Sequence, residues 1–256
     1  MLRPEHSSIM QCMTTSLLVL WDIDHTLVDT GGLGREAYAS AFRAATGVEL
    51  SEKWRFDGRT EGAAAVEALE LHGLEAEPAL VRRLLDEIVG VHERLADSFA
   101  VHSRALPGVR EALAALAGIA GVHQSVLTGN LRAVAELKLA AVGLEVGPGG
   151  SLNMEIGAYG SDAIERTELA PVAFARAGSL LGVEFSGRNT VIVGDTPRDV
   201  ATADAVGATC VAVATGYHST EELAAAGAGV VFADLSDTGA FVAAVEAVMV
   251  KAASAC

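Results

Sequence analysis

The chain alternates between short apolar runs and longer stretches in which apolar residues recur every three or four positions. Short runs continuous in Val, Ile and Leu are typical of strands buried on both faces, and the periodic stretches are typical of amphipathic helices. This alternation predicts βαβ units, and hence an α/β fold with a doubly wound parallel sheet. The predicted strands are Leu17–Trp21, Gln124–Leu127, Leu152–Ile156, Thr190–Val193, Cys210–Ala214 and Gly229–Phe232.

One long stretch carries only the helical pattern. Between Gly31 and Arg104 there is no convincing strand, and helices are predicted at Arg35–Thr46, Glu61–Leu71 and Pro78–Ala96. Because these segments have apolar faces of their own and interrupt the βαβ order, we expect an all-helical cap inserted after the first strand. The expected division is an N-terminal tail at 1–15, a core domain at 16–30 and 105–256, and the cap at 31–104.

The balance of charges limits the partners of this chain. Its 33 acidic and 18 basic residues give a net charge of 18 − 33 = −15. A chain this acidic repels a phosphate backbone, and the sequence lacks the basic face of a membrane-surface helix. We therefore expect neither nucleic acid nor a membrane among its partners. Hydrophobic residues make up 51% of the chain, which is enough to fill a large core.

The cysteines and the N-terminus predict a cytoplasmic protein. Cys12, Cys210 and Cys256 lie far apart and form no CxxC pair, which argues against a disulfide framework or a zinc site. The first apolar run, Leu17–Trp21, is too short for a signal sequence or a membrane span. The residues before it read as a loose tail, in which Met13 is as plausible a start as the first residue.

Polar and acidic residues follow three of the predicted strands. Ligands of open α/β sheets bind beyond the carboxyl ends of the strands, so these positions are the first candidates for chemistry. If the strands that precede the two acidic segments are neighbours, their carboxylates converge. The three segments are Asp22-Ile23-Asp24-His25-Thr26, Thr128-Gly129-Asn130 and Gly194-Asp195-Thr196-Pro197-Arg198-Asp199.

The spacing of the aspartates favours a divalent cation. Asp22 and Asp24 lean to the same side of an extended chain, and neighbouring carboxylates raise each other's pKa unless a cation neutralises them. A hard ion with oxygen ligands, Mg²⁺ before others, fits such a site and leaves room for water and a phosphate oxygen. The competing interpretation is a strand-end cap at Asp22 and a turn residue at Asp24. Asp195 directly follows a strand, where capping does not explain it.

Two of the segments also have structural explanations. Thr196, Pro197 and Asp199 form a predicted capping box, and Asn130 is a predicted N-cap. Neither explanation excludes a function. A capping carboxylate can still face the site, and the free N–H groups at a helix start favour an anion beside Thr128.

Taken in order, these motifs resemble those of the haloacid dehalogenase (HAD) superfamily of phosphatases and phosphotransferases. The resembling segments are Asp22-Ile23-Asp24-His25-Thr26-Leu27, Thr128-Gly129-Asn130 and Gly194-Asp195-Thr196-Pro197-Arg198-Asp199. Within the superfamily, the chain looks like the phosphoglycolate-phosphatase-like branch, which has a helical cap between its first and second motifs. The resemblance implies a Rossmann-like core and an Mg²⁺-dependent phosphatase that hydrolyses a small phosphorylated metabolite through an aspartyl phosphate.

The same resemblance implies a role for each motif residue. Asp22 is the expected nucleophile, and Asp24 is the expected general acid for the leaving oxygen and then the base for water. Thr128, with Gly129 and Asn130, is expected to bind the phosphoryl group. The expected Mg²⁺ ligands are Asp22, Asp195 and the backbone carbonyl of Asp24, with Asp199 in support.

The family also places a cation, usually a Lys before a Pro, after the third strand, and this sequence departs from that pattern. The candidates are Arg166 and Lys138. Lys138 falls in the predicted helix Leu131–Val142, about 12 Å along its axis from Asn130, so we interpret it as a solvated side chain. We prefer Arg166, near the next helix start, because a guanidinium can clamp a phosphate bidentately; an exposed surface charge is the alternative.

In the cap, the segment Phe56-Asp57-Gly58-Arg59-Thr60-Glu61 resembles the loop that related enzymes lower onto the substrate. Arg59 is then expected to meet the non-reacting part of an acidic substrate. The alternative is that Thr60 caps the next helix and Arg59 is exposed to solvent.

Other functions share parts of this pattern. A sugar phosphomutase has the same motifs, and a non-catalytic signalling domain would also accept phosphate, although Asp24 argues against a stored signal because a base speeds hydrolysis. A dehalogenase is disfavoured, because it needs neither the second aspartate nor a metal, and both are implied here. A phosphonate hydrolase would use a cap lysine, and Lys53 is the only one. We expect a monomer or a homodimer.

Overall fold

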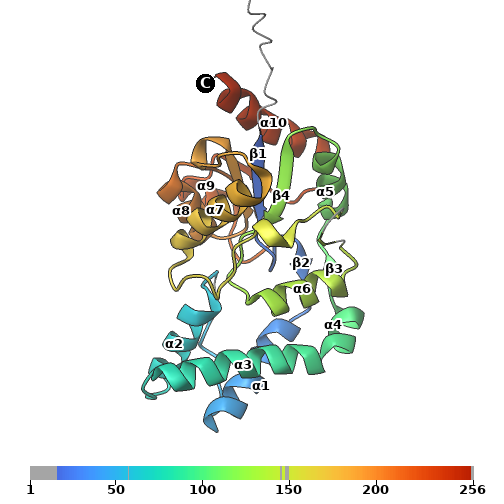
Figure 1. The fold of residues 1–256 in the computed structure, drawn as a ribbon. Helices are drawn as coiled ribbons and strands as arrows, with labels where there is room; N and C mark the ends of the chain where they lie inside the picture. Colours follow the sequence, from blue (N-terminus) through green and yellow to red (C-terminus); the bar gives the residue numbers. More distant parts are fainter. Residues whose placement is uncertain (1–15, 57, 145, 148–149, 255–256) are drawn as a thin grey trace, which may run out of the picture.

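The computed structural model describes residues 16–56, 58–144, 146–147 and 150–254 (Figure 1). The predicted tail with its alternative start at Met13, and the residues Cys12, Asp57 and Cys256, lie outside the described residues. Cys210 is buried as a free thiol. None of the helices in the described ranges combines the length and the apolar character that a membrane span needs.

A five-stranded sheet in the order β4-β1-β5-β6-β7 forms the centre of the molecule. Every neighbouring pair in it is parallel. All residues of β1 and β5 are buried, as continuous apolar runs predict. The strands are β1 (Leu17–Trp21), β4 (Val122–Val126), β5 (Thr190–Gly194), β6 (Thr209–Val213) and β7 (Val230–Phe232). The predicted α/β fold with a parallel sheet is confirmed.

Helices cover both faces of this sheet. Side chains alternate along a strand, so Leu17, Val19 and Trp21 join the core under one face while Leu18 and Leu20 join the core under the other. The first core lies against α5 (Val109–Ala117) and α10 (Thr238–Ser254). The second lies against α7 (Leu169–Leu181), α8 (Pro197–Val206) and α9 (Thr220–Ala225).

A separate group of helices lies beyond the carboxyl ends of the strands (Figure 1). We call α1 to α4 the helical layer: α1 (Leu33–Thr46), α2 (Glu61–Leu71), α3 (Pro78–Arg94) and α4 (Ala96–His102). Their apolar faces share one core that includes Phe42, Leu69 and Ile88. The all-helical cap is therefore present in the fold, and the division at residues 31 and 104 stays a prediction.

Two features join the helical layer to the sheet. The short antiparallel pair β2 (Val28–Asp29) and β3 (Arg104–Ala105), which the sequence analysis missed, stands where the chain enters and leaves the layer. Helix α6 (Arg132–Ala141) contributes Leu139 to the core of the sheet and Val134 to the core of the layer. It runs across the carboxyl edge of the sheet (Figure 1).

One predicted strand is wrong. Leu152–Ile156 holds a bridge at Leu152 and the 3-10 helix η1 (Met154–Ile156) instead. The physical reason is a polar residue within the apolar run: the Asn153 side chain accepts the Glu155 N–H at 3.1 Å, which favours a turn over an extended chain. The predicted helix Pro78–Ala96 also ends early, because α3 and α4 meet at Leu95.

Candidate active site

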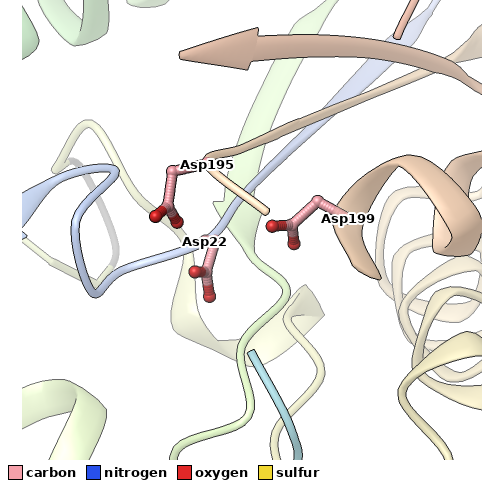
Figure 2. A group of neighbouring side chains, drawn as sticks. All are labelled: Asp22, Asp195 and Asp199. Atoms are coloured by element: carbon pink, nitrogen blue, oxygen red, sulfur yellow. The ribbon is translucent and has the colours of Figure 1, made fainter. Parts of the chain in front are cut away.

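The first and third motifs come together because β1 and β5 are neighbours in the sheet. Trp21 pairs with Val193, and the Asp22 N–H donates to the Val193 carbonyl at 2.8 Å. Asp195 follows β5, and Asp199 lies in the first turn of α8. Carboxylate oxygens of Asp22, Asp195 and Asp199 lie within 4.8 Å of one another, and all three side chains are buried (Figure 2). We call these three residues the aspartate cluster.

Arg166 forms ion pairs with two residues of the aspartate cluster. It precedes α7 in the 3-10 helix η2 (Arg166–Glu168) and is 6% exposed, so the alternative of a surface charge is wrong. Its Nη2 is 3.0 Å from Asp22 Oδ1 and donates to Asp199 Oδ1 at 2.5 Å. The buried Nε has no hydrogen-bond partner among the described residues. Two of the five guanidinium N–H donors bind the carboxylates of Asp22 and Asp199, and one on Nη1 binds the Gly58 carbonyl at 3.1 Å. Among the described residues two donors therefore have no partner, and the role of Arg166 stays a prediction.

Asp199 caps α8 and also faces the other two aspartates, so the capping carboxylate does face the site. It accepts from the Thr196 N–H at 3.0 Å and from the Thr196 hydroxyl at 2.7 Å, and α8 begins with the predicted capping box. Its other oxygen accepts from Arg166, so this carboxylate holds the start of α8 and the guanidinium together. Asp199 is thus close to the cation site while most of its lone pairs are already used.

Asp195 is held differently. The Thr26 hydroxyl donates to Asp195 Oδ1 at 3.4 Å. The backbone of Gly216 lies so close that a Cβ at Gly216 would be 1.8 Å from Asp195 Oδ2. The position therefore requires a glycine, and this close backbone fixes where the Asp195 carboxylate lies.

The aspartate cluster has more negative charge than its own cation can balance. With all groups ionised, Asp22, Asp195 and Asp199 bring three negative charges against the one positive charge of Arg166. Burial raises the pKa of Asp22 to about 6 against the opposing effect of Arg166. Burial, and then the charges of Asp22 and Asp199, raise the pKa of Asp195 well above its usual range. These groups fit a hard divalent cation, which would lower both pKa values.

Asp24 belongs to a second group with Lys138 and Asn130, which we call the Lys138 cluster. The Lys138 ammonium donates to Asp24 at 2.8 Å (Oδ1) and 2.7 Å (Oδ2), and to Asn130 Oδ1 at 2.7 Å. Burial acts to raise the pKa of Asp24, but the Lys138 charge and hydrogen bonds outweigh it and lower the pKa. The carboxylate is therefore already stabilised by the protein.

The interpretation of Lys138 as a solvated side chain is wrong, since it is 4% exposed. A distance of about 12 Å along the axis of α6 separates Lys138 from the strand ends only if the helix points away from them. Helix α6 instead runs across the carboxyl edge of the sheet (Figure 1). The Lys138 ammonium, two turns along it, therefore still reaches Asp24.

Asn130 faces the site and does not cap α6. The N-cap position is Leu131, and the Asn130 amide donates to Asp24 Oδ2 and to the Thr128 hydroxyl, both at 2.8 Å. The predicted capping role is therefore wrong. Thr128 is fully buried, and because its oxygen accepts from Asn130, its own O–H remains a donor.

The second motif is contacted by the last residues of the predicted cap loop, where α2 begins. The Glu61 N–H donates to the Gly129 carbonyl at 2.8 Å, and Glu61 Oε2 accepts from the Leu131 N–H at 2.6 Å. A Cβ at Gly129 would lie 1.9 Å from the Arg59 carbonyl, so only glycine allows this approach. The anion at the start of α6 is thus a carboxylate of the protein itself.

The side chain of Arg59 has a carboxylate partner in α2. Its guanidinium pairs with Glu67 at 2.5 Å, within the helical layer, and Thr60 caps α2 as predicted by accepting from the Ala63 N–H at 3.2 Å. Its expected contact with substrate stays a prediction.

Glu61 ends the predicted cap loop, but no feature of the sequence predicts its contact with the second motif. It is 2% exposed, and burial raises its pKa to about 7 against the opposing effects of Lys138 and the Leu131 N–H. An acidic residue in the first turn of a helix is common. The sequence around Glu61 therefore does not indicate its hydrogen bond with the Leu131 N–H.

The sequence pattern of the haloacid dehalogenase-like hydrolase family matches residues 19–204. The chain therefore belongs to this family, and the resemblance seen in the motifs is confirmed.

Solved structures agree on the fold. A hydrolase from Pseudomonas syringae has a TM-score of 0.69 at 22% identity, covering 90% of this chain and 99% of its own. A β-phosphoglucomutase candidate from Bacteroides vulgatus has a TM-score of 0.67 at 19% identity over 93% and 92% of the two chains. A phosphoglycolate phosphatase candidate from Haemophilus somnus has a TM-score of 0.59 at 20% identity over 90% and 99%. No functionally curated protein matches the sequence. At these identities the likeness establishes the fold alone.

Proposed function

We propose that this protein is an Mg²⁺-dependent phosphatase that hydrolyses the phosphoric monoester of a small metabolite through an aspartyl phosphate. The observation that carries the proposal is the aspartate cluster with Arg166 at the strand ends of a HAD-family chain. A phosphate dianion repels a carboxylate nucleophile, so the site must provide positive charge before reaction. Arg166 provides part of it, and the excess of carboxylates provides a place for a divalent ion.

The proposed ligands of the ion are Asp22, Asp195 and the backbone carbonyl of Asp24, with Asp199 in support. The close backbone of Gly216, which holds Asp195 in place, and the raised pKa values of Asp22 and Asp195 support this fit. When bound, the ion supplies positive charge that offsets the repulsion between nucleophile and phosphate. The other steps belong to the side chains of the protein.

In the first step, an Asp22 carboxylate oxygen bonds to phosphorus while the P–O bond to the leaving group breaks. The electron pair of that bond stays on the leaving oxygen, which takes the proton of Asp24 in its protonated, carboxylic acid form. Arg166, 3.0 Å from Asp22, is placed to neutralise the phosphoryl oxygens. The Thr128 hydroxyl and the backbone around Gly129 are the proposed contacts of the phosphoryl group.

In the second step, water attacks the phosphorus of the aspartyl phosphate. The water gives a proton to Asp24, the bond from phosphorus to the Asp22 oxygen breaks, and inorganic phosphate leaves. Asp24 and Asp22 thereby return to their starting states.

The proposal is tested with p-nitrophenyl phosphate in Mg²⁺ and in EDTA. We expect turnover that depends on Mg²⁺ and falls by about 10⁴-fold or more in Asp22→Asn, as for loss of a nucleophile. Asp204→Asn, an exposed aspartate of α8, is the matched control. An inactive wild-type protein, or an Asp22→Asn variant with wild-type activity, would contradict the proposal.

Substrate class and reaction type need a second assay. A panel of metabolite phosphates is incubated with the enzyme, and both inorganic phosphate and isomeric sugar phosphates are measured. We expect release of inorganic phosphate. Conversion of a sugar phosphate to its isomer without phosphate release would identify a phosphomutase, and a long-lived phosphoprotein without turnover would identify the signalling alternative.

A further inference from the structure

All three N–H donors of the Lys138 ammonium have acceptors within the protein. They are the two oxygens of Asp24, at 2.8 and 2.7 Å, and Asn130 Oδ1, at 2.7 Å. An ammonium group has no further donor. Lys138 therefore has no hydrogen bond left for a substrate phosphate, unlike Arg166 with its unpartnered Nε.

Most of the lone-pair positions of the Asp24 carboxylate are also occupied. An ionised carboxylate offers about four lone-pair positions on its two oxygens. Asp24 Oδ2 accepts from Lys138 and from the Asn130 amide, while Oδ1 accepts, among the described residues, from Lys138 alone. One position, on Oδ1, is left.

We propose that Lys138 is the positioning residue of Asp24: by holding both carboxylate oxygens it leaves Oδ1 as the atom that carries the transferred proton. This inference rests on the proposed function, in which Asp24 gives a proton to the leaving oxygen. The chain thus uses two cations for separate tasks. Arg166 faces the nucleophile, and Lys138 orients the acid and base.

The surroundings of Lys138 fix its ammonium independently of any substrate. Helix α6 is anchored in two cores, through Leu139 on the side of the sheet and Val134 on the side of the helical layer. A Cβ at Gly34 in α1 would lie 3.8 Å from the Lys138 Nζ, so the helical layer closes on this atom. The Asn130 side chain, which accepts from Lys138, is itself held in place because its amide donates to the Thr128 hydroxyl.

Loss of Lys138 should lower the rate by an amount that depends on the leaving group. During the first step a proton leaves Asp24 Oδ1 as the P–O bond breaks, and this transfer matters most for a leaving group that is a strong base. Loss of Lys138 frees the carboxylate to rotate, so it slows the esters of weakly acidic alcohols more than those of acidic phenols. A side chain that only stabilises the fold would slow all esters alike.

The experiment measures kcat/KM with Mg²⁺ for a series of phenyl and alkyl phosphates that spans leaving-group pKa. We expect Lys138→Met to lose about a hundredfold for the most basic leaving groups and little for p-nitrophenol. Arg132→Met is the matched control, because Arg132 is on the same helix and pairs with Glu136 and Glu155 away from Asp24. It should retain the wild-type dependence.

A double-variant cycle tests whether Lys138 acts through Asp24. The variant Asp24→Asn/Lys138→Met should be no slower than Asp24→Asn alone, because nothing is left to orient. Equal loss across the series in Lys138→Met, or a double variant much slower than Asp24→Asn, overturns the inference while leaving the phosphatase intact. A wild-type protein without turnover overturns the proposed function and this inference together.

Thermal unfolding shows whether Lys138→Met is folded under the assay conditions. If it is not, Lys138→Arg replaces it, since its charge remains while the planar guanidinium cannot reproduce contacts from a single nitrogen. We expect the same leaving-group dependence with a smaller loss, about tenfold for basic leaving groups. A uniform loss in this variant also overturns the inference.

Discussion

The two clusters at the strand ends differ in how their charges are balanced. The aspartate cluster sets three carboxylates against Arg166, so its full ionisation leaves 1 − 3 = −2. The Lys138 cluster sets Asp24 against Lys138, which leaves 1 − 1 = 0. The pKa values follow: that of Asp195 is raised well above its usual range, and that of Asp24 is lowered.

This difference separates a site built to receive a cation from one that is complete within the protein. A buried cluster with excess negative charge is destabilised until an external cation enters. A balanced cluster with satisfied hydrogen bonds holds its groups in place before the substrate arrives. The following predictions test this contrast, from the largest expected effect to the smallest.

Catalysis should depend more on the cation of the aspartate cluster than on Lys138. Arg166 touches Asp22 directly, so we expect Arg166→Ala to lower kcat/KM by about 10³-fold or more for all esters, and Lys138→Ala by at most about 10²-fold, for the esters of the most basic leaving groups. Steady-state assays with the substrate panel measure both. Arg188→Ala, at an exposed position, is the control. A larger loss from Lys138→Ala would reverse the assignment of the two cations.

Mg²⁺ should stabilise the folded protein. At a free concentration about a hundredfold above Kd, binding adds about 2.7 kcal/mol, or roughly 5–10 °C in Tm for a chain of this size. Asp195→Asn should lose this shift, because it removes a proposed ligand. Differential scanning fluorimetry with Mg²⁺ and with EDTA measures the effect, and Asp204→Asn should keep the wild-type shift. An unchanged shift in Asp195→Asn would show that the ion binds elsewhere.

Without metal, neutralising an aspartate should have opposite effects in the two clusters. Asp195→Asn removes repulsion, so we expect the free energy of unfolding to rise by about 1 kcal/mol. Asp24→Asn leaves the Lys138 charge without its partner, so we expect it to fall by about 2 kcal/mol. Urea denaturation in EDTA at pH 7 measures both variants. Changes of the same sign would refute the contrast.

A pH-dependent effect is expected at Glu61, which lies beside the Lys138 cluster. Its folded pKa of about 7 is above the ordinary value of 4.5, so ionisation destabilises the fold progressively as pH rises through this window. Glu61→Gln keeps an acceptor for the Leu131 N–H and does not ionise. We expect it to exceed the wild-type stability by on the order of 1 kcal/mol at pH 8 and to match it near pH 4.5.

Urea denaturation at the two pH values measures the difference between variant and wild type, with Glu70→Gln on the exposed side of α2 as control. An equal gain from Glu61→Gln at both pH values would contradict a raised pKa.

Much of the fold was predictable because its signals are local. The continuous apolar runs of β1 and β5, and the helix Glu61–Leu71, are visible in the order of side chains alone. The run Leu152–Ile156 misled because apolar composition does not register what the Asn153 side chain does to the backbone. The pair β2–β3 was missed because two-residue strands leave no periodicity to detect.

The sequence by itself determined which acidic and polar residues follow the strands. Asp22, Asp24 and Asp195 follow predicted strands, and the sequence predicts that their carboxylates converge if those strands are neighbours. The pairing of β1 with β5 meets this condition for Asp22 and Asp195. Only the tertiary structure decided which neighbours each of them has. Lys138 and Glu61 reach the second motif because α6 crosses the sheet edge and the helical layer closes on it. Such contacts join residues far apart in the chain, and the spacing of residues along a sequence contains no information about the direction in which a packed helix runs.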